Sequence, residues 1–252
     1  PSTDYTVTLK ASMADIYGQK LSEPVVIRFK TDAYQPSVEV STYSLYGVLA
    51  AHLPRVYQLR TMNWGRPINA KLESISFEKM GNLEASGSPI GNRSYDTSAP
   101  LNTAKILDVD LDQIAGRKLT NGYYKLNFDD LGKQTYAARS LIITDTALTL
   151  KRDVSSMLVW ATDLKSGAVV ANLPVRIWAP VSEYDRSALK KVVEGKTNAE
   201  GIARLSLDES MQFEGLIVEG SDATRLAYAE TDWSDGISVW NYGLERSYAR
   251  GS

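Results

Sequence analysis

Apolar and polar residues alternate with a period of two along most of this chain. In residues 5–9 and 25–29 every odd-numbered residue is apolar, and the even-numbered residues are polar except for Val26. Successive side chains of a strand point to opposite faces, so each run predicts a strand with one buried face. A turn signal at residues 15–19 separates the runs, and residues 1–31 are therefore expected to form at least one hairpin.

A two-stranded hairpin cannot bury an apolar face by itself. Either earlier strands of the same unit cover this face or the hairpin packs on the strands that come later in the chain, and the first alternative is preferred. Residues 31–35 and Pro36 read as a short linker.

A second series of strands is expected between residues 37 and 144. The predicted strands are 38–42, 56–62, 68–77, 105–111, 123–128 and 140–144, with a short turn or helix at 113–115. Residues 81–100 are rich in Gly, Ser, Asn and Pro and have almost no apolar period, so they are predicted to be a long loop.

The third series is the clearest. Alternating or apolar runs lie at 147–151, 157–162, 169–178 (read as a pair of strands), 192–193, 202–205, 216–220 and 226–229. Residues 187–194 could pass for a helix, but Val192 and Val193 favour a strand because branched side chains lose χ1 freedom in a helix. About seven short strands separated by turns are typical of a two-sheet sandwich. The predicted fold class is all-β, with tandem antiparallel β-sandwich domains of immunoglobulin-like or fibronectin-like type.

Composition narrows the function classes. The 252 residues suit two domains and a fragment of a third, and the net charge of -2 comes without a basic stripe for nucleic acid. No apolar run approaches the ~18 residues of a membrane helix. The chain has no cysteine, which excludes a disulfide, a thiolate metal site, a cysteine nucleophile and a thioester within it. The start at Pro1 and the end at Ser252 are both interpreted as cuts in a longer polypeptide.

Two polar features are candidates for a metal or catalytic site. His52 is the one histidine, and no cysteine or second histidine accompanies it, nor does a nucleophile-elbow sequence. Asp108, Asp110 and Asp112 alternate as at the start of a calcium loop, but the required glycine and the closing glutamate of such a loop are absent. We therefore expect a half-buried or surface histidine and acidic residues on the solvent face of a strand.

Three further sequence patterns give weaker indications of a ligand site or an activity. The glycines of residues 87–91 are too close together for a phosphate loop, and no lysine follows. Thirty acidic residues guarantee that some carboxylate pair exists, so glycoside hydrolysis is neither favoured nor excluded. Trp233, Trp240 and Tyr242 could form a sugar platform, or they could belong to a core or a contact between domains.

Residues 158–178 and 197–203 resemble the strand–turn–strand unit and a later turn of the macroglobulin-type domains of bacterial α2-macroglobulins. Residues 233–243 resemble the linker that leads to the next such domain. The resemblance is strongest over 143–243 and fades toward residue 37. Residues 4–31 resemble the last strands of a bacterial immunoglobulin-like domain.

The resemblance implies a domain organisation and a parent protein. Residues 1–35 would end an Ig-like domain, 36–143 and 144–240 would be macroglobulin-like domains, and 241–252 would be a linker. Members of the family are broad-range protease traps with a bait region and an internal Cys–Gln thioester. This chain has no cysteine and no recognisable bait segment, so both would lie beyond Ser252 if the parent has them.

The predicted function is a non-catalytic structural segment of such an inhibitor, without cofactor, metal or active site. Its expected partners are other domains of the parent chain and, through the parent, target proteases. The expected location is extracytoplasmic, with membrane anchoring through the parent chain and not through this segment. The alternative is an adhesin or stalk module that binds a protein or a glycan at the cell surface, and an enzyme is the third class.

Overall fold

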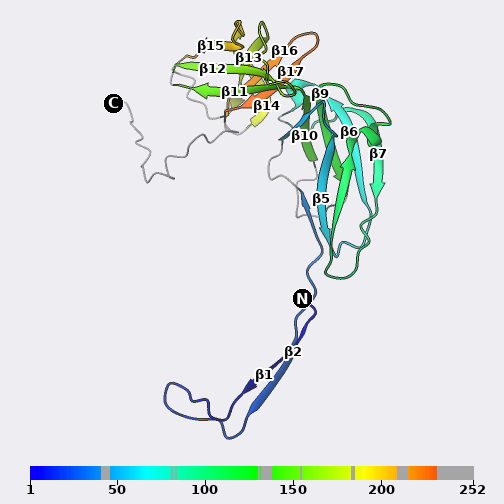
Figure 1. The fold of residues 1–252 in the computed structure, drawn as a ribbon, viewed down its shortest axis with the longest axis vertical. Helices are drawn as coiled ribbons and strands as arrows, with labels where there is room; N and C mark the ends of the chain where they lie inside the picture. Colours follow the sequence, from blue (N-terminus) through cyan, green and yellow to red (C-terminus); the bar gives the residue numbers. More distant parts are fainter. Residues whose placement is uncertain are drawn as a thin grey trace.

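The structure is a computed structural model that describes residues 1–40, 46–80, 82, 84–129, 131, 138–153, 155–182, 185–208 and 215–231. Its N-terminal element is the predicted hairpin, in which β1 (Asp4–Leu9) pairs antiparallel with β2 (Val25–Lys30). The hairpin projects away from the rest of the molecule (Figure 1). Tyr5 and Phe29 stack at 5.3 Å on its apolar face, yet both are nearly half exposed. The prediction of strands was right, but the predicted buried face is exposed.

The first sandwich consists of two sheets. Its three-stranded sheet has the order β3 (Ser37–Val40), β5 (Val56–Met62), β8 (Ala104–Asp110). Its five-stranded sheet has the order β4 (Tyr46–Ala50), β10 (Ala138–Thr144), β9 (Gly122–Asp129), β6 (Ile68–Ile75), β7 (Ser88–Tyr95). The pairing is antiparallel except between β4 and β10, which run parallel.

The core of the first sandwich lies between these two sheets. Leu59 and Leu107 from the smaller sheet meet Leu72, Leu126 and Leu141 from the larger one, and all are buried. The short helix α1 (Leu111–Ala115) closes one end of this core. Alternate residues of each strand point inward, which is why the period of two predicted these strands.

The predicted loop at 81–100 is wrong in its middle part, because residues 88–95 form strand β7. Among the described strands, β7 pairs only with β6 and is an edge strand, so most of its side chains face solvent and carry no apolar alternation. Pro89 is tolerated at an edge, where a missing backbone N–H costs little. Gly91 is needed, because a Cβ there would lie 2.2 Å from the carbonyl oxygen of Ile114 in α1.

The second sandwich also has two sheets. The three-stranded sheet has the order β11 (Thr146–Arg152), β12 (Ser156–Asp163), β15 (Ile202–Ser206). The four-stranded sheet has the order β14 (Asp185–Lys196), β13 (Pro174–Ser182), β16 (Ile217–Ser221), β17 (Leu226–Glu230). All of its pairs are antiparallel, and Val159, Val175, Ile177 and Val218 lie in its buried core.

Two local predictions in the second sandwich have different outcomes. Residues 187–194 belong to strand β14, as the branched residues indicated. Of the pair of strands predicted over residues 169–178, only the second forms: Val169 makes an isolated bridge to Thr162, and β13 begins at Pro174. A turn intervenes, in which Asn172 has a positive φ of 59°.

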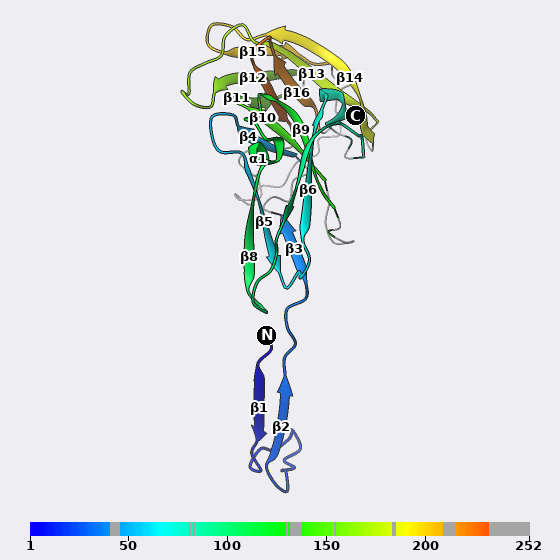
Figure 2. The same ribbon diagram turned by 90° about the vertical axis from the view of Figure 1, so that its right-hand side faces the viewer.

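The second sandwich lies at the end of the first sandwich that is opposite to the hairpin (Figure 2). A 3₁₀ turn, η1 (Phe77–Lys79), follows β6 at this end. The three parts therefore form an extended row, with the two sandwiches in contact.

Candidate functional site: the contact between the two sandwiches

The contact between the sandwiches is a cluster of apolar and aromatic side chains. The outer face of the four-stranded sheet of the second sandwich contributes Ile217 and Tyr228, which are buried, and the partly buried Trp178. The opposing side chains of the first sandwich are Phe77, Met80, Tyr123 and Ile142, and all of them are buried. At this contact, the five-stranded sheet of the first sandwich and the four-stranded sheet of the second sandwich therefore bury their outer faces as well as their inner faces.

Phe77 lies at the centre of the aromatic part of this cluster. Its ring centroid is 5.2 Å from that of Trp178, 5.7 Å from that of Tyr123 and 6.2 Å from that of Tyr228. These are the separations at which tilted aromatic pairs attract each other beyond the effect of burial. Two of the three neighbours belong to the second sandwich, so Phe77 joins the two units.

The segment that carries Phe77 is fastened to the larger sheet by polar contacts. The Ser140 hydroxyl donates to the Met80 carbonyl at 2.9 Å, and Lys125 Nζ donates to the Ala85 carbonyl at 2.9 Å. Ser140 and Lys125 are opposite each other on β10 and β9. Because both are almost fully buried, these bonds hold the segment flat against the outer face of the sheet.

Polar groups inside the contact have specific environments. The Tyr228 hydroxyl donates to the buried carboxylate of Glu230 through a short bond. Burial raises the pKa of the Tyr123 phenol far above its ordinary 10.0, and the negative charges of Glu219 and Glu78 raise it further. The phenol is therefore neutral at physiological pH, which suits a packing role.

The covalent junction between the sandwiches is held by Asp145, the residue between β10 and β11. Its carboxylate Oδ1 accepts the backbone N–H of His52 at 3.0 Å and lies 2.6 Å from His52 Nδ1. Its carbonyl accepts the N–H of Leu164 from the second sandwich at 2.7 Å. The side chain of His52, which was expected at the surface or half-buried, is 23% exposed and contacts the junction through Asp145.

The three alternating aspartates do not converge on one point. Asp108 accepts from Gln58 Nε2 at 2.9 Å, Asp110 caps α1 by accepting the Gln113 N–H, and Asp112 pairs with Arg55 at 2.8 Å. Asp108 and Asp110 lie on the outer face of strand β8, as expected, while Asp112 lies in α1 and pairs with the buried Arg55. Among the residues that the structure describes, no group of three or more His, Asp or Glu side chains could hold a metal ion.

The remaining candidates have simpler positions. Residues 88–91 of the glycine-containing segment belong to strand β7, and the Gly87 N–H donates to Glu73. Trp233, Trp240 and Tyr242 lie outside the described residues. No helix in the described part of the chain has the length and apolar character needed to cross a membrane.

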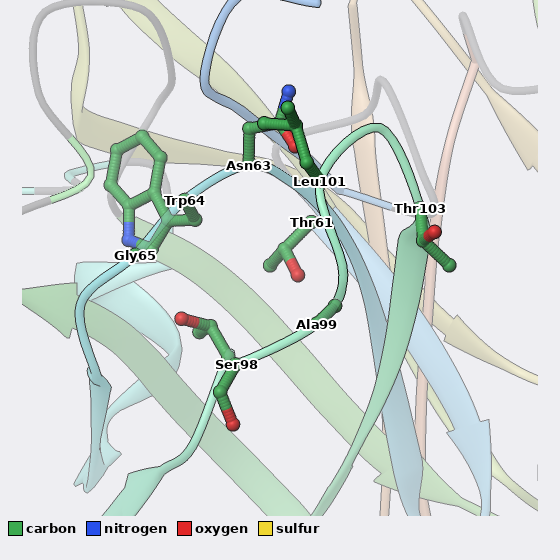
Figure 3. Close-up of a pocket in the computed structure, with 9 residues that line it drawn as sticks. Thr61, Asn63, Trp64, Gly65, Ser98, Ala99, Leu101 and Thr103 are labelled. Carbon is green, nitrogen blue, oxygen red and sulfur yellow. The ribbon is translucent and has the colours of Figure 1, made fainter.

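The opposite end of the first sandwich holds a cavity of about 380 Å³ (Figure 3). Its walls are the segment after β5, with Asn63 and Trp64, and the segment before β8, with Ser98 and Leu101. Beside it, Asn63 Nδ2 donates to the Tyr34 carbonyl at 2.7 Å, which fastens the hairpin linker to the sandwich.

Asn102 completes this attachment of the linker. Its Oδ1 accepts the Tyr34 N–H at 2.9 Å, and its own N–H donates to Asn63 Oδ1 at 2.7 Å. Asn63 and Asn102 have positive φ angles of 49° and 62°, a conformation that asparagine tolerates better than most residues. Sequence reasoning missed this asparagine pair, since its two members are far apart in the chain.

Part of this chain matches a known family model. Residues 143–248 match the family model described as the bacterial alpha-2-macroglobulin MG3 domain. The solved structures that resemble the fold include native alpha-2-macroglobulin of Escherichia coli spanning domains MG0-NIE-MG1. The sequence identity is 14% and the TM-score is 0.64, and the alignment covers 92% of this chain and 75% of the E. coli chain. The E. coli structure spanning only NIE-MG1 matches 79% of this chain and 98% of its own, with 13% identity and a TM-score of 0.61.

This chain spans only a small part of another, longer solved structure. The Salmonella alpha-2-macroglobulin mutant Y1175G is 13% identical with a TM-score of 0.67 over 93% of this chain, which spans 14% of that chain. The comparison with curated protein sequences finds no match.

Proposed function

We propose that the chain is a non-catalytic structural segment of a bacterial α2-macroglobulin-like protease inhibitor, on the premise that residues 143–248 match the bacterial alpha-2-macroglobulin MG3 domain model. In this role the two sandwiches position neighbouring domains and pass a change of shape from one to the next. Its partners are the other domains of the parent chain and, through the parent, target proteases. The parent acts outside the cytoplasm and is anchored to the membrane by another segment.

The aromatic contact is the observation that carries this proposal. Phe77 lies against Trp178 and Tyr228 of the second sandwich, while Asp145 fixes the covalent junction. A flexible chain of independent domains needs no buried contact between them. Two domains that share a buried aromatic cluster move together, and this is what transmission of a shape change requires.

The proposed domain boundaries are 1–35, 36–143, 144–240 and a linker at 241–252. The exposed face of the hairpin supports the first of them, because Tyr5, Val7, Ile27 and Phe29 need a covering sheet. The matched share of this chain falls from 92% to 79% when the solved relative lacks the domain MG0, a difference about the size of residues 1–35. The hairpin is thus proposed to end an Ig-like domain.

A protease protection assay on the full-length parent tests the inhibitory role. Folded parent is mixed with an endoprotease, and its activity is measured on a large protein substrate and on a small peptide substrate. A trap blocks only the large substrate. If every protease tested keeps full activity on both substrates, the inhibitory role is wrong.

The scaffolding role needs a separate comparison. The parent that carries Phe77→Ala should trap less protease than the parent that carries Trp160→Phe, since Trp160 is 41% exposed on the second sandwich and takes no part in the contact. Equal trapping by both variants, with the wild-type parent active, would refute transmission through this contact and leave inhibition intact.

A further inference from the structure

The loop at the outer end of the N-terminal hairpin presents two large apolar side chains to solvent. Ile16 is 90% exposed and Tyr17 is 80% exposed, more than any other large apolar side chain that the structure describes, and Met13 and Leu21 of the same loop are exposed as well. The loop lies at the end of the hairpin that is farthest from the sandwiches (Figure 2). An exposed apolar patch at an extremity of the molecule indicates a contact with something outside it.

The turn that carries this pair is closed by its own hydrogen bonds. The Asp15 N–H donates to the Gln19 carbonyl at 2.9 Å, and the Gly18 N–H donates to the Asp15 carbonyl at 3.1 Å. Asp15 Oδ1 accepts the N–H groups of Tyr17 and Gln19, both at 2.9 Å. Four backbone donors beside the apolar pair are therefore satisfied within the loop, as an apolar medium requires, since an unpaired backbone group is costly there.

The apolar face of the hairpin is a different surface. That face carries odd-numbered strand residues such as Val7 and Ile27, and a covering sheet packs on it from one side. Ile16 and Tyr17 are adjacent in the loop beyond the last strand pair, Leu9–Val25. Side chains as exposed as these two are open on several sides, so a flat sheet leaves part of the pair in water. A fluid apolar layer surrounds both.

The charges of the loop suit the boundary between lipid headgroups and acyl chains. Lys10 and Lys20 have alkyl stems that can lie along apolar surface while the ammonium groups stay in the headgroup layer. Tyrosine is enriched at this boundary, because its ring is apolar and its hydroxyl is polar. Asp15 and Glu23 balance the two lysines, so residues 10–24 carry no net charge. A carboxylate in the turn limits how deeply it enters the lipid.

We propose that Ile16 and Tyr17 enter the headgroup–acyl boundary of a lipid bilayer and orient the parent protein on the membrane. Even a myristoyl chain gives only marginal binding, so two side chains do not hold a protein by themselves. The proposal therefore rests on the proposed anchoring of the parent by another segment, which keeps the tip close to the lipid. The row of domains then stands off the membrane, with the second sandwich at its far end (Figure 2).

The test replaces the natural anchor by a tether. The cysteine-free chain receives a decahistidine tag before Pro1 and is held on phosphatidylcholine vesicles that contain a nickel lipid. Because the tether is artificial, neither a missing anchor nor a lack of protease inhibition in the parent affects the result. An environment-sensitive fluorophore is attached through Gln19→Cys beside the tip or through Glu200→Cys in the second sandwich, where both original side chains are exposed. Nitroxide lipids then report the depth of the fluorophore.

The fluorophore at Gln19→Cys should shift its emission to the blue on vesicles and be quenched by nitroxides on the upper acyl chain. The fluorophore at Glu200→Cys should show neither effect. The double variant Ile16→Ser, Tyr17→Ser should lower the ratio of inserted to free tip at least about tenfold, the factor for removing one buried apolar side chain or more. Its two sites are so exposed that the substitutions leave the fold intact.

Two controls separate the tip from general hydrophobicity. Ile16→Leu keeps an apolar side chain and should keep insertion. Leu101→Ser with Val181→Ser removes side chains that are 66% and 67% exposed outside the hairpin, and it should leave the ratio unchanged. Replacing a quarter of the phosphatidylcholine by phosphatidylglycerol should also change little, because the loop has no net charge.

Three results would overturn the proposal. The first is the absence of a blue shift and of quenching at Gln19→Cys in the tethered chain. The second is undiminished insertion of the variant Ile16→Ser, Tyr17→Ser, which would assign lipid binding to another surface such as the apolar face of the hairpin. The third is a blue shift that appears without vesicles as the chain concentration rises, which would show that the tip docks on a second copy of the protein and not on lipid.

Discussion

The aromatic contact predicts that one substitution will uncouple the two sandwiches. Phe77→Ala removes a ring that is 7% exposed and touches Trp178 and Tyr228 across the contact. The matched change is Phe128→Ala, which removes a ring that is 2% exposed inside the first sandwich, 6.1 Å from Tyr57. The two variants lose the same atoms at similar burial, and they differ in what those atoms touch.

The expected magnitude depends on the contacts of each ring. Truncation of a buried phenylalanine to alanine costs about 3–5 kcal/mol. Each aromatic pair adds about 0.5–1.5 kcal/mol beyond burial, and Phe77 makes two such pairs with the second sandwich. The coupling free energy between the sandwiches should therefore fall by about 1–3 kcal/mol, which corresponds to a factor of about 5 to 150.

Amide hydrogen exchange, followed by mass spectrometry, measures where this loss appears. In Phe77→Ala, peptides from β16 and β17 should exchange about 5 to 150 times faster, because these strands lose their cover. In Phe128→Ala, the faster exchange should appear in β5 and β9 and leave β16 and β17 protected. The same exchange pattern in both variants, or unchanged exchange of β16 and β17 in Phe77→Ala, would show that the contact does not couple the sandwiches.

Three further changes test individual interactions. Asp112→Ala leaves the cation of Arg55 buried without its partner, and chemical denaturation should show a loss of about 2–3 kcal/mol, while Asp112→Asn should lose less because it retains an acceptor. Hydrogen bonds from Ser98, and then from Lys105, lower the pKa of Asp96 to about 2 from its ordinary 3.8. The folded state therefore binds this proton less readily than the unfolded state. The ionised carboxylate adds stability above about pH 4, and this stability is lost as the pH falls through 2. An NMR titration checks the pKa, and Asp96→Asn should remove this part of the acid dependence of stability. Asn102→Gly keeps the positive φ but removes the side chain that holds the linker, so the linker amide should exchange faster with little change in overall stability, and unchanged exchange would contradict the attachment.

How well the sequence predicted each element depended on its burial. The strands of the second sandwich were predicted closely because their inner residues, such as Val159 and Ile177, alternate with half-exposed or exposed ones. Strand β7 was missed because an edge strand is held by backbone hydrogen bonds to one neighbouring strand. Backbone hydrogen bonds do not require an alternation of apolar and polar side chains. The hairpin was predicted as strands, but its apolar face gave no information about what covers it.

The candidate site was much less predictable than the fold. His52 was expected to be a surface or half-buried polar residue, and it is half-buried, but its partner Asp145 is 93 residues away and no local pattern joins them. Phe77 read as the end of a strand, whereas it lies in a 3₁₀ turn and contacts two residues more than a hundred positions later. The asparagine pair beside the cavity was not predicted for the same reason.

The sequence by itself determined that this protein is a series of β-strands folded into sandwiches, because a period of two is a local property of each strand. It also excluded cysteine chemistry, since that depends on composition alone. Only the tertiary structure decided which outer faces meet, which loops enclose the cavity and which residue orients the junction. Those features arise where segments distant in the chain approach one another, and a one-dimensional pattern records the face that a residue occupies but not the partner that it meets.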